Sequence, residues 1–498
     1  MDILFASSEA HPLIKTGGLA DVAGSLPPAI RRLRHDIRLI IPAYRQVLEQ
    51  VSRFTLVAHL QPDTTSQPVR LLAGRLPGST VTVYLVDSPQ HFDRDGNPYS
   101  MKNGSAWPDN AERFTAFCSA IQAVAVNAAG LDWRPELVHC NDWQTALVPP
   151  LLKGNAHRPA TVFTIHNLAY QGLFDWRVFK QLNLPAEFWS MEAMEFHNQF
   201  SFIKGGLVFA DWVTTVSPTY AKEIRTSEFG CGLDGLLKHR ADTLTGIVNG
   251  VDYSVWNPGR DLLIPVQYNQ RSLFHKVENK RELQAYFGLP VDSGVPLFAI
   301  ISRLVEQKGI DLVMEVVPAL IEQGAQLVIL GSGDSRLEAA ILNARKEHPQ
   351  HIGVYLGYNE GLAHHIEAGA DMFLMPSRFE PCGLNQIYSQ RYGTVPIVRR
   401  TGGLADTVTD TTPDTLENRT ATGFSFQAAT ATALLDTIHR ALEHYRQPDA
   451  WRQIVTTGMK QDFSWKRSAE RYIELYNTVL ATRARNAARP GITLPGTG

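Results

Sequence analysis

A series of short, unbroken apolar runs constrains the fold of this chain more than any other feature. The runs do not alternate with polar residues, which is typical of parallel strands buried on both faces. Longer stretches with helical periodicity separate them, so each half of the chain is predicted to form an open α/β sheet built from βα units. Functional side chains are expected beyond the carboxyl ends of the strands. The predicted strands are Ile3–Ser7, Ile37–Ile41, Val81–Val86, Leu137–Cys140, Val162–His166, Leu297–Ser302, Gln326–Leu330, Met372–Met375 and Val395–Val398.

The length of 498 residues exceeds what one ordinary core supports, so more than one domain is expected. The segment Asn249-Gly250-Val251-Asp252 follows an apolar stretch and precedes a region rich in Asn and Pro. We therefore predict two domains, 1–250 and 251–464, that meet there. Trp465–Ala484 has the pattern of a long helix, and Pro and Gly predict a disordered tail over 486–498.

Composition narrows the class of protein. The chain is 44% hydrophobic and 19% charged, which is typical of soluble globular proteins, and its formal net charge of −2 argues against a nucleic-acid binder. No run reaches the roughly 20 apolar residues that span a bilayer, and the N-terminus lacks the basic region of a signal peptide. The 4 cysteines are scattered without a CxxC pair. We expect a cytoplasmic protein without a membrane or nucleic-acid partner.

The hexapeptide Thr-Gly-Gly-Leu-Ala-Asp occurs twice, at Thr16–Asp21 and at Thr401–Asp406. A cation precedes each copy, Lys15 in the first and Arg400 in the second. A glycine pair lets backbone N–H groups approach an anion, and the start of a helix adds its positive dipole end. The repeat predicts a phosphate-rich ligand held by both halves, with chance recurrence as the alternative.

Two loops of the second half could complete such a site. Arg303 and Lys308 lie five residues apart after a predicted strand, where Arg could bind a phosphate bidentately and Lys could act as a point charge. Glu380 lies in the Pro- and Gly-bounded segment Pro376–Gln386 and could accept hydrogen bonds from sugar hydroxyls. Surface ion pairs for the cations, and a helix N-cap role for Glu380, are the alternatives.

Four further patterns are ambiguous. His166 ends a predicted strand and could be functional or structural. Cys382 is interpreted as a packing residue, because no histidine lies near it in sequence. Gly331-Ser-Gly333 lacks the third glycine of a dinucleotide fingerprint and predicts a tight turn. Asp93-Arg-Asp95 is interpreted as a loop rather than a metal site, so no metal or other cofactor is expected.

Several of these segments, in this order, resemble bacterial glycogen synthases and plant starch synthases: Lys15–Val22, Arg303 to Gly309, Pro376–Gln386 and Arg400–Val408. The resemblance covers nearly the whole chain. It implies a GT-B glycosyltransferase whose two Rossmann-like domains face each other across a deep cleft, with helix 465–485 packing back on the first domain. It also implies retaining transfer of glucose from ADP-glucose to the 4-hydroxyl at the non-reducing end of an α-1,4-glucan, without a metal.

The resemblance assigns roles to individual residues. The positions implied to be catalytic are Arg303, Lys308, Glu380 and His166. Those implied to bind the donor are Lys15, Gly18, Asp142, Tyr358, Gly402, Gly403 and Leu404. Those implied to bind the acceptor glucan are Asp21, Tyr99 and Asn249, whereas Asp406 is expected only to begin a helix.

The chain departs from the family pattern at two places. Many relatives have His-Asp-Trp-His where this chain has Asn141–Gln144, so hydrogen bonding around Asp142 is expected to differ. Related retaining transferases carry a second glutamate where this chain has Tyr388, which puts ribose recognition by a carboxylate in doubt. A sugar-nucleotide 2-epimerase and a catalytically silent glucan-binding protein are the rival interpretations.

Overall fold

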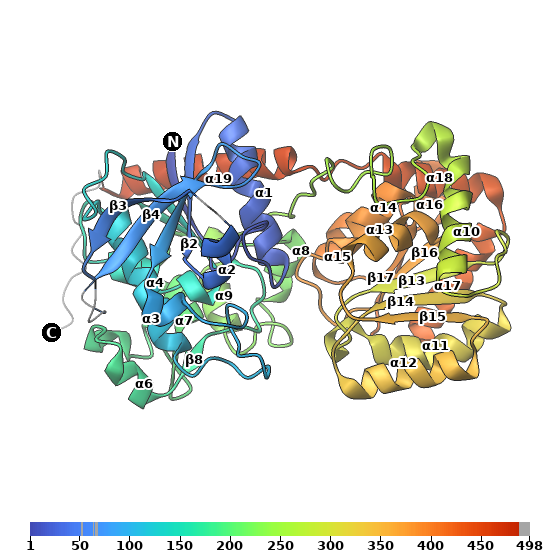
Figure 1. The fold of residues 1–498 in the computed structure, drawn as a ribbon, viewed down its shortest axis with the longest axis horizontal. Coiled ribbons are helices and arrows are strands. Elements are labelled where there is room, and N and C mark those ends of the chain that lie inside the picture. The colour runs from blue at the N-terminus through green and yellow to red at the C-terminus, as the bar shows by residue number, and fades with distance from the viewer. Residues whose placement is uncertain (51–52, 63, 65–67, 488–498) are drawn as a thin grey trace. The chain divides into compact units, whose positions relative to one another are not determined.

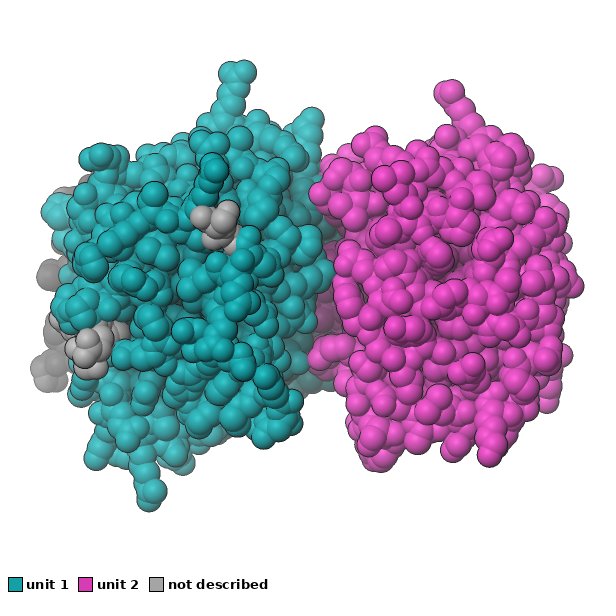
Figure 2. Space-filling view, viewed as in Figure 1, with its two compact units in different colours: residues 1–216, 221–250, 465–498 teal, residues 217–220, 251–464 magenta. Residues whose placement is uncertain are grey.

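The computed structural model describes residues 1–50, 53–62, 64 and 68–487, and its chain divides into two compact units (Figures 1 and 2). Unit 1 comprises Met1–Val216, Ala221–Gly250 and Trp465–Gly498, and unit 2 comprises Ser217–Tyr220 and Val251–Ser464. The short segment Ser217–Tyr220, which the sequence analysis assigns to the first domain, thus belongs to unit 2. No described helix has the length and apolar character needed to cross a bilayer.

Unit 1 is built on a nine-stranded sheet of order β12-β11-β7-β6-β1-β2-β5-β4-β3. Its strands pair in parallel except at β3 and β4, which form an antiparallel edge that the sequence analysis did not predict. The order reverses between β1 and β6, which makes this the switch point where an open sheet binds its ligands. The strands are β1 Asp2–Ala6, β2 Asp36–Pro42, β3 Thr55–Leu60, β4 Val69–Arg75, β5 Thr82–Asp87, β6 Leu137–Asn141, β7 Ala160–Ile165, β11 Trp212–Thr215 and β12 Leu244–Gly246.

Helices and a small second sheet complete unit 1. The short sheet has the order β8-β10-β9. Its strands are β8 Leu173–Phe174, β9 Glu195–Phe196 and β10 Gln199–Ser201. The helices are α1 Gly18–Arg32, α2 Arg45–Gln50, α3 Pro89–Phe92, α4 Asn110–Ala125, α5 Val148–Leu152, α6 Trp176–Gln181, α7 Phe202–Phe209, α9 Asp234–His239 and α19 Trp465–Ala487, with α8 Pro218–Glu223 crossing into unit 2.

The last helix, α19, packs on the first elements of the chain. Figure 1 shows it in red beside the blue helix α1, which it contacts. Tyr472 and Tyr476 are fully buried, and the Tyr476 hydroxyl lies 2.7 Å from Nδ1 of His139 on β6. Because α19 runs to Ala487, residues 486–487 are helical rather than part of the expected disordered tail; the remainder of that tail lies outside the described residues.

Unit 2 is built on a six-stranded parallel sheet of order β15-β14-β13-β16-β17-β18, which reverses between β13 and β16. Side chains alternate between two cores: on β13, Phe298 and Ile300 face one core, and Leu297 and Ala299 face the other. The strands are β13 Leu297–Ile301, β14 Gln326–Gly331, β15 Ile352–Leu356, β16 Met372–Met375, β17 Val395–Arg399 and β18 Phe424–Phe426.

Helices cover both faces of this sheet. In Figure 1, α11 and α12 lie on one face, and α10 and α13 lie on the other. The helices of unit 2 are α10 Lys276–Tyr286, α11 Ile310–Glu322, α12 Ser335–Glu347, α13 Glu360–Gly369, α14 Asn385–Tyr392, α15 Gly402–Thr407, α16 Pro413–Glu417, α17 Ala431–Tyr445 and α18 Pro448–Met459.

Candidate active site

The central feature of unit 2 is an ion pair at its switch point. Lys308 follows β13 and Glu380 follows β16, and Lys308 Nζ lies 2.5 Å from Glu380 Oε2. The two side chains are only 17% and 7% exposed. The Ser377 hydroxyl also donates to Glu380 Oε2, at 2.9 Å. Because β13 and β16 are neighbours, the topology brings together two residues that are 72 positions apart in sequence.

The loops that carry this pair are clamped to each other. Gly309 has a φ of 68°, and a Cβ at this position would clash with the carbonyl of Pro376. The main-chain N–H of Arg378 donates to the Gln307 carbonyl at 2.8 Å, and the Arg378 guanidinium pairs with Asp311 at 2.6 Å. These contacts hold the main chain on either side of Lys308 against the loop that carries Glu380.

Arg303 lies on the same loop, directly after β13. Its Nη2 is 3.4 Å from Oε1 of Gln307. The segment around Arg303 packs on the Gly331-Ser-Gly333 turn, where a Cβ on Gly331 would clash with the Ser302 carbonyl and one on Gly333 with the Leu304 carbonyl. The predicted tight turn is confirmed. Its two glycines allow the segment that carries Arg303 to pack closely against the turn.

The second hexapeptide copy packs on the Glu380 loop. Gly402 has a φ of 43°, and a Cβ there would clash with the Glu380 carbonyl. A Cβ on Gly403 would likewise clash with the carbonyl of Cys382, a buried residue, and the Gly403 N–H donates to the Glu380 carbonyl at 3.1 Å. Leu404 is fully buried beside these glycines.

The expectation that Asp406 begins a helix is wrong. It lies late in α15, and its carboxylate accepts hydrogen bonds from Thr219 N at 3.0 Å and Thr219 Oγ1 at 2.6 Å, and from the Ser217 hydroxyl. These bonds explain why residues 217–220 belong to unit 2.

Two other residues of unit 2 lie outside the Lys308–Glu380 cluster. Tyr358 follows β15, an edge strand separated from β13 by β14; it is 76% exposed, and its hydroxyl donates to Glu360 at 2.8 Å. Tyr388, which stands where related transferases have a glutamate, stacks on Trp256 with ring centroids 3.9 Å apart. The aromatic contact gives this position a packing role.

In unit 1 the candidate residues gather at the carboxyl ends of β1, β6 and β7. Asp142 follows β6 with φ 57° and ψ 179°, a strained conformation for a residue other than glycine. Its Oδ1 accepts a hydrogen bond from the His166 N–H at 2.7 Å. Burial raises the pKa of Asp142 to about 7, although backbone hydrogen bonds from His166 and Asn167 oppose this. A carboxylate with a raised pKa in a strained turn is typical of functional sites.

The imidazole of His166 is held in one orientation. Its Nε2 lies 2.9 Å from Oδ1 of Asn141, whose amide nitrogen donates to the Ala6 carbonyl at 2.9 Å. Since that amide nitrogen is already donating, the asparagine oxygen accepts and Nε2 of His166 carries the proton. Burial lowers the pKa of His166 to about 3, so the ring is neutral at physiological pH. Asn141, one of the departures from the family pattern, thus determines the histidine tautomer.

A carboxylate that the sequence analysis missed holds the first hexapeptide copy. Glu9 follows β1 and is 3% exposed; its Oε2 accepts from Thr16 N at 2.5 Å and Thr16 Oγ1 at 2.8 Å. The Tyr99 hydroxyl lies 3.2 Å from Glu9 Oε1 and 2.7 Å from the Ser8 hydroxyl. Burial raises the pKa of Glu9. Glu9 therefore links the Lys15 loop to Tyr99, two predicted site positions.

The glycines of the first copy are in open surroundings. A Cβ on Gly17 or Gly18 would have nothing within 4 Å. Lys15 Nζ lies 2.8 Å from Oδ1 of Asp21, and the two side chains are 36% and 26% exposed. Whereas unit 2 needs glycine at Gly402 and Gly403 for its own packing, unit 1 leaves the space beside Gly17 and Gly18 empty.

Asn249 is 7% exposed, and its Oδ1 has no hydrogen-bond partner among the described residues. Asp93 and Asp95 lie in the predicted loop, between α3 and α4, and both pair with Arg45 on α2, at 2.6 and 2.8 Å. Within the part of the chain that the structure describes, no group of three or more His, Cys, Asp or Glu side chains is arranged to hold a metal ion.

Comparison with known proteins identifies the family of this chain. Residues 2–239 match the family model described as the starch synthase catalytic domain, and residues 285–456 match that of glycosyl transferases group 1. A glycogen synthase of Thioalkalivibrio sulfidiphilus is 54% identical over 97% of this chain and 100% of its own length. The chain belongs to the family of bacterial glycogen synthases and starch synthases.

Two solved structures share the fold of this chain. The catalytic domain of starch synthase IV from Arabidopsis thaliana, solved with ADP and acarbose, has a TM-score of 0.86 and 33% identity, covering 96% of this chain and 99% of that one. A sucrose-phosphate synthase from Thermosynechococcus elongatus has a TM-score of 0.58 and 17% identity, covering 97% and 99%, and shows the fold alone. As a member of the glycogen and starch synthase family, the chain is a glycosyltransferase with the GT-B fold, and glucosyl transfer to a glucan is the activity that its relatives' names give.

Proposed function

We propose that this chain is a retaining glucosyltransferase that elongates α-1,4-glucan. Its donor is ADP-glucose, and its acceptor is the 4-hydroxyl at the non-reducing end of the chain. The similarity to a starch synthase solved with ADP and acarbose supports a nucleoside diphosphate donor and a glucan acceptor.

The observation that carries this proposal is the ion pair of Lys308 and Glu380, 2.5 Å apart at the switch point of unit 2. As the glycosidic bond breaks, the leaving ADP gains negative charge and the sugar becomes oxocarbenium-like. Groups that bind this state more tightly than the substrate raise the rate. Lys308 and Arg303 would stabilise the departing diphosphate, which frees Glu380 to accept hydrogen bonds from the sugar.

In the proposed mechanism, no histidine of unit 1 acts as a general acid. Because burial lowers the pKa of His166 to about 3, its neutral ring cannot supply a proton at neutral pH. We propose that the acceptor hydroxyl attacks from the side of the leaving group and that the departing phosphate takes its proton. Lys15 and the open edge at Gly18 would contact the donor, whereas Asp21, Tyr99 and Asn249 would contact the glucan.

The first test is substitution of the two cations. Arg303→Ala and Lys308→Ala should each lower turnover by about a hundredfold, because losing one contact to the developing charge costs about 3 kcal/mol. Lys346→Ala, which removes an exposed cation from α12 of the same unit, is the matched control and should retain full activity. Near-native turnover of both site variants, with unchanged circular dichroism, would refute the assignment.

A second experiment identifies the donor and the product. The protein is incubated with glycogen and either ADP-glucose or UDP-glucose, each labelled in glucose. We expect label from ADP-glucose in the polymer, released again as maltose by β-amylase, which shows α-1,4 extension at non-reducing ends. Labelled epimeric sugar nucleotide would indicate an isomerase, and an unchanged donor a binding protein. A covalent glucosyl-enzyme trapped on a side chain would contradict the proposed mode of attack.

A further inference from the structure

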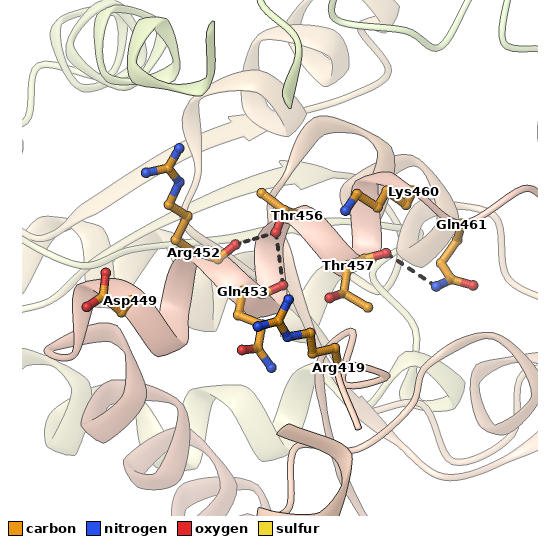
Figure 3. A pocket seen from close by; sticks show the side chains of 8 residues that line it. All are labelled: Arg419, Asp449, Arg452, Gln453, Thr456, Thr457, Lys460 and Gln461. Carbon is orange, nitrogen blue, oxygen red and sulfur yellow. Dashed lines mark hydrogen bonds between the residues drawn. The ribbon is translucent and has the colours of Figure 1, made fainter. Parts of the chain in front are cut away.

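A cavity of about 420 Å³ opens on unit 2, away from the residues of the candidate active site. Its lining comes from one face of α18, the residues that follow this helix, and the turn after α16 (Figure 3). The lining residues are Arg419, Asp449, Arg452, Gln453, Thr456, Thr457, Lys460 and Gln461. None of them has a role in the proposed transfer reaction.

The charge of this cavity is strongly unbalanced. Arg419, Arg452 and Lys460 line it, and within the described residues none of them forms an ion pair with a carboxylate. Asp449 is the one acid among the lining residues. Exposed cations that repel one another in a shared cavity are expected to attract a counterion of comparable charge.

The main chain at Arg419 has a conformation that is uncommon for arginine. Arg419 directly follows Asn418, the last residue of the α16 cap, and has a φ of 55°. Glycine is favoured at this position of a helix end, because a side chain is strained in the left-handed region. Arg419→Gly therefore removes this cation without straining the end of α16.

The spacing of the cations indicates the class of ligand. Arg452 and Lys460 lie eight residues apart along α18 and its cap, or about 12 Å at 1.5 Å per residue. Arg419 approaches from the neighbouring turn. No aromatic side chain lines the cavity, so a nucleobase or a glucose ring would find no stacking surface. We propose that this cavity binds a small metabolite with two separated phosphate groups, of the hexose bisphosphate class.

Calorimetric titration of the full chain with fructose 1,6-bisphosphate tests the proposal. We expect saturable binding that is at least tenfold weaker in Arg419→Gly, since a charged hydrogen bond is lost. The melting temperature of this variant should stay unchanged or rise, because glycine relaxes the backbone. Asp449→Asn should bind more tightly than the wild type, because it removes a repelling carboxylate.

Controls separate this cavity from the candidate active site. Arg303→Gln and Lys346→Gln should bind the bisphosphate like the wild type, and glucose 6-phosphate should bind at least tenfold more weakly. Absence of saturable binding would overturn the proposal. The proposal would also be overturned if Arg303→Gln lost bisphosphate binding while Arg419→Gly kept it, because the anion would then bind at the donor site. Equal affinity for the monophosphate would overturn the bisphosphate class.

Discussion

At the scale of single residues, two carboxylates organise the candidate residues of unit 1. Glu9 binds the Lys15 loop and Asp142 binds the His166 main chain, each through backbone N–H groups. Burial raises the pKa of both. Both are therefore sensitive to pH and to neutral substitution, and each can be tested separately.

The raised pKa of Asp142 predicts a pH dependence of stability. An unfolded Asp has a pKa near 3.8, and the folded value is about 7. Between these values the folded chain binds more protons than the unfolded one, so the free energy of unfolding falls as pH rises, by about 1.4 kcal/mol for each pH unit between the two pKa values. Asp142→Asn should lack this contribution.

Urea unfolding of the wild type and Asp142→Asn at pH 4.5 and 8, in the same buffers, measures the difference directly. The wild type should lose more stability than the variant across this interval. Equal losses would show that Asp142 titrates normally in the folded protein.

Glu9 is predicted to position the Lys15 loop. Glu9→Gln keeps the size of the side chain but removes the charge that binds Thr16, and one lost charged hydrogen bond corresponds to about 1.5–3 kcal/mol. We expect the value of kcat/KM for ADP-glucose to fall at least tenfold, mainly through KM. The exposed Glu49→Gln on α2 is the matched control. A fall in kcat with KM unchanged would contradict a positioning role.

Some site residues can be predicted from the sequence and others cannot. The predicted positions of Arg303, Asp142 and His166 at strand ends are confirmed. A buried parallel strand is a continuous apolar run, so its carboxyl end can be recognised in the sequence. Glu9 was missed although Ser-Ser-Glu directly follows β1, because its role depends on a contact with Thr16 that only the folded loop creates. The bonds of Asp406 to Ser217 and Thr219 were likewise hidden, since they join segments far apart in sequence.

At the scale of elements, the two hexapeptide copies show that identical sequence can meet different demands. The glycines of the second copy pack the start of α15 against the Glu380 loop, whereas those of the first border empty space. Nine strands with continuous apolar runs were predicted, but the parallel strands β11, β12, β15 and β18 were not. The antiparallel strands β3 and β4 were also missed, because β3 is largely exposed and β4 is only partly buried, so neither gives a continuous apolar signal.

A matched pair of substitutions tests this difference. Gly403→Ala should destabilise unit 2 by about 1–3 kcal/mol, because its Cβ would clash with the Cys382 carbonyl. Gly18→Ala should leave stability unchanged or slightly higher, since alanine favours a helix by up to about 1 kcal/mol, yet it should impair donor binding. Thermal unfolding together with the KM for ADP-glucose measures both effects. Equal destabilisation by the two changes would contradict the distinction.

At the scale of the whole molecule, unit 1 is assembled from both ends of the chain. Residues 465–487 form a helix whose Ala469, Tyr472 and Tyr476 side chains are buried in that unit. Full burial of each large apolar side chain contributes about 1.5–3 kcal/mol. A chain ending at Ser464 should therefore lose the cooperative unfolding of unit 1 while unit 2 retains its own transition.

Differential scanning calorimetry of the truncated and full-length chains measures this. Tyr476→Phe, which removes only the hydrogen bond to His139, is the milder control and should cost about 1 kcal/mol. Unchanged unfolding of unit 1 after truncation would show that α19 is dispensable.

The discontinuity of unit 1 also sets the order in which the protein can be completed on the ribosome. Domains usually fold in the order of their synthesis. Here, however, the first 216 residues leave the ribosome without the helix that fills their core, while all segments of unit 2 have been made by Ser464. Unit 2 is thus the first to have all its parts, and the nascent unit 1 must keep the surface that receives α19 open until that helix has been made.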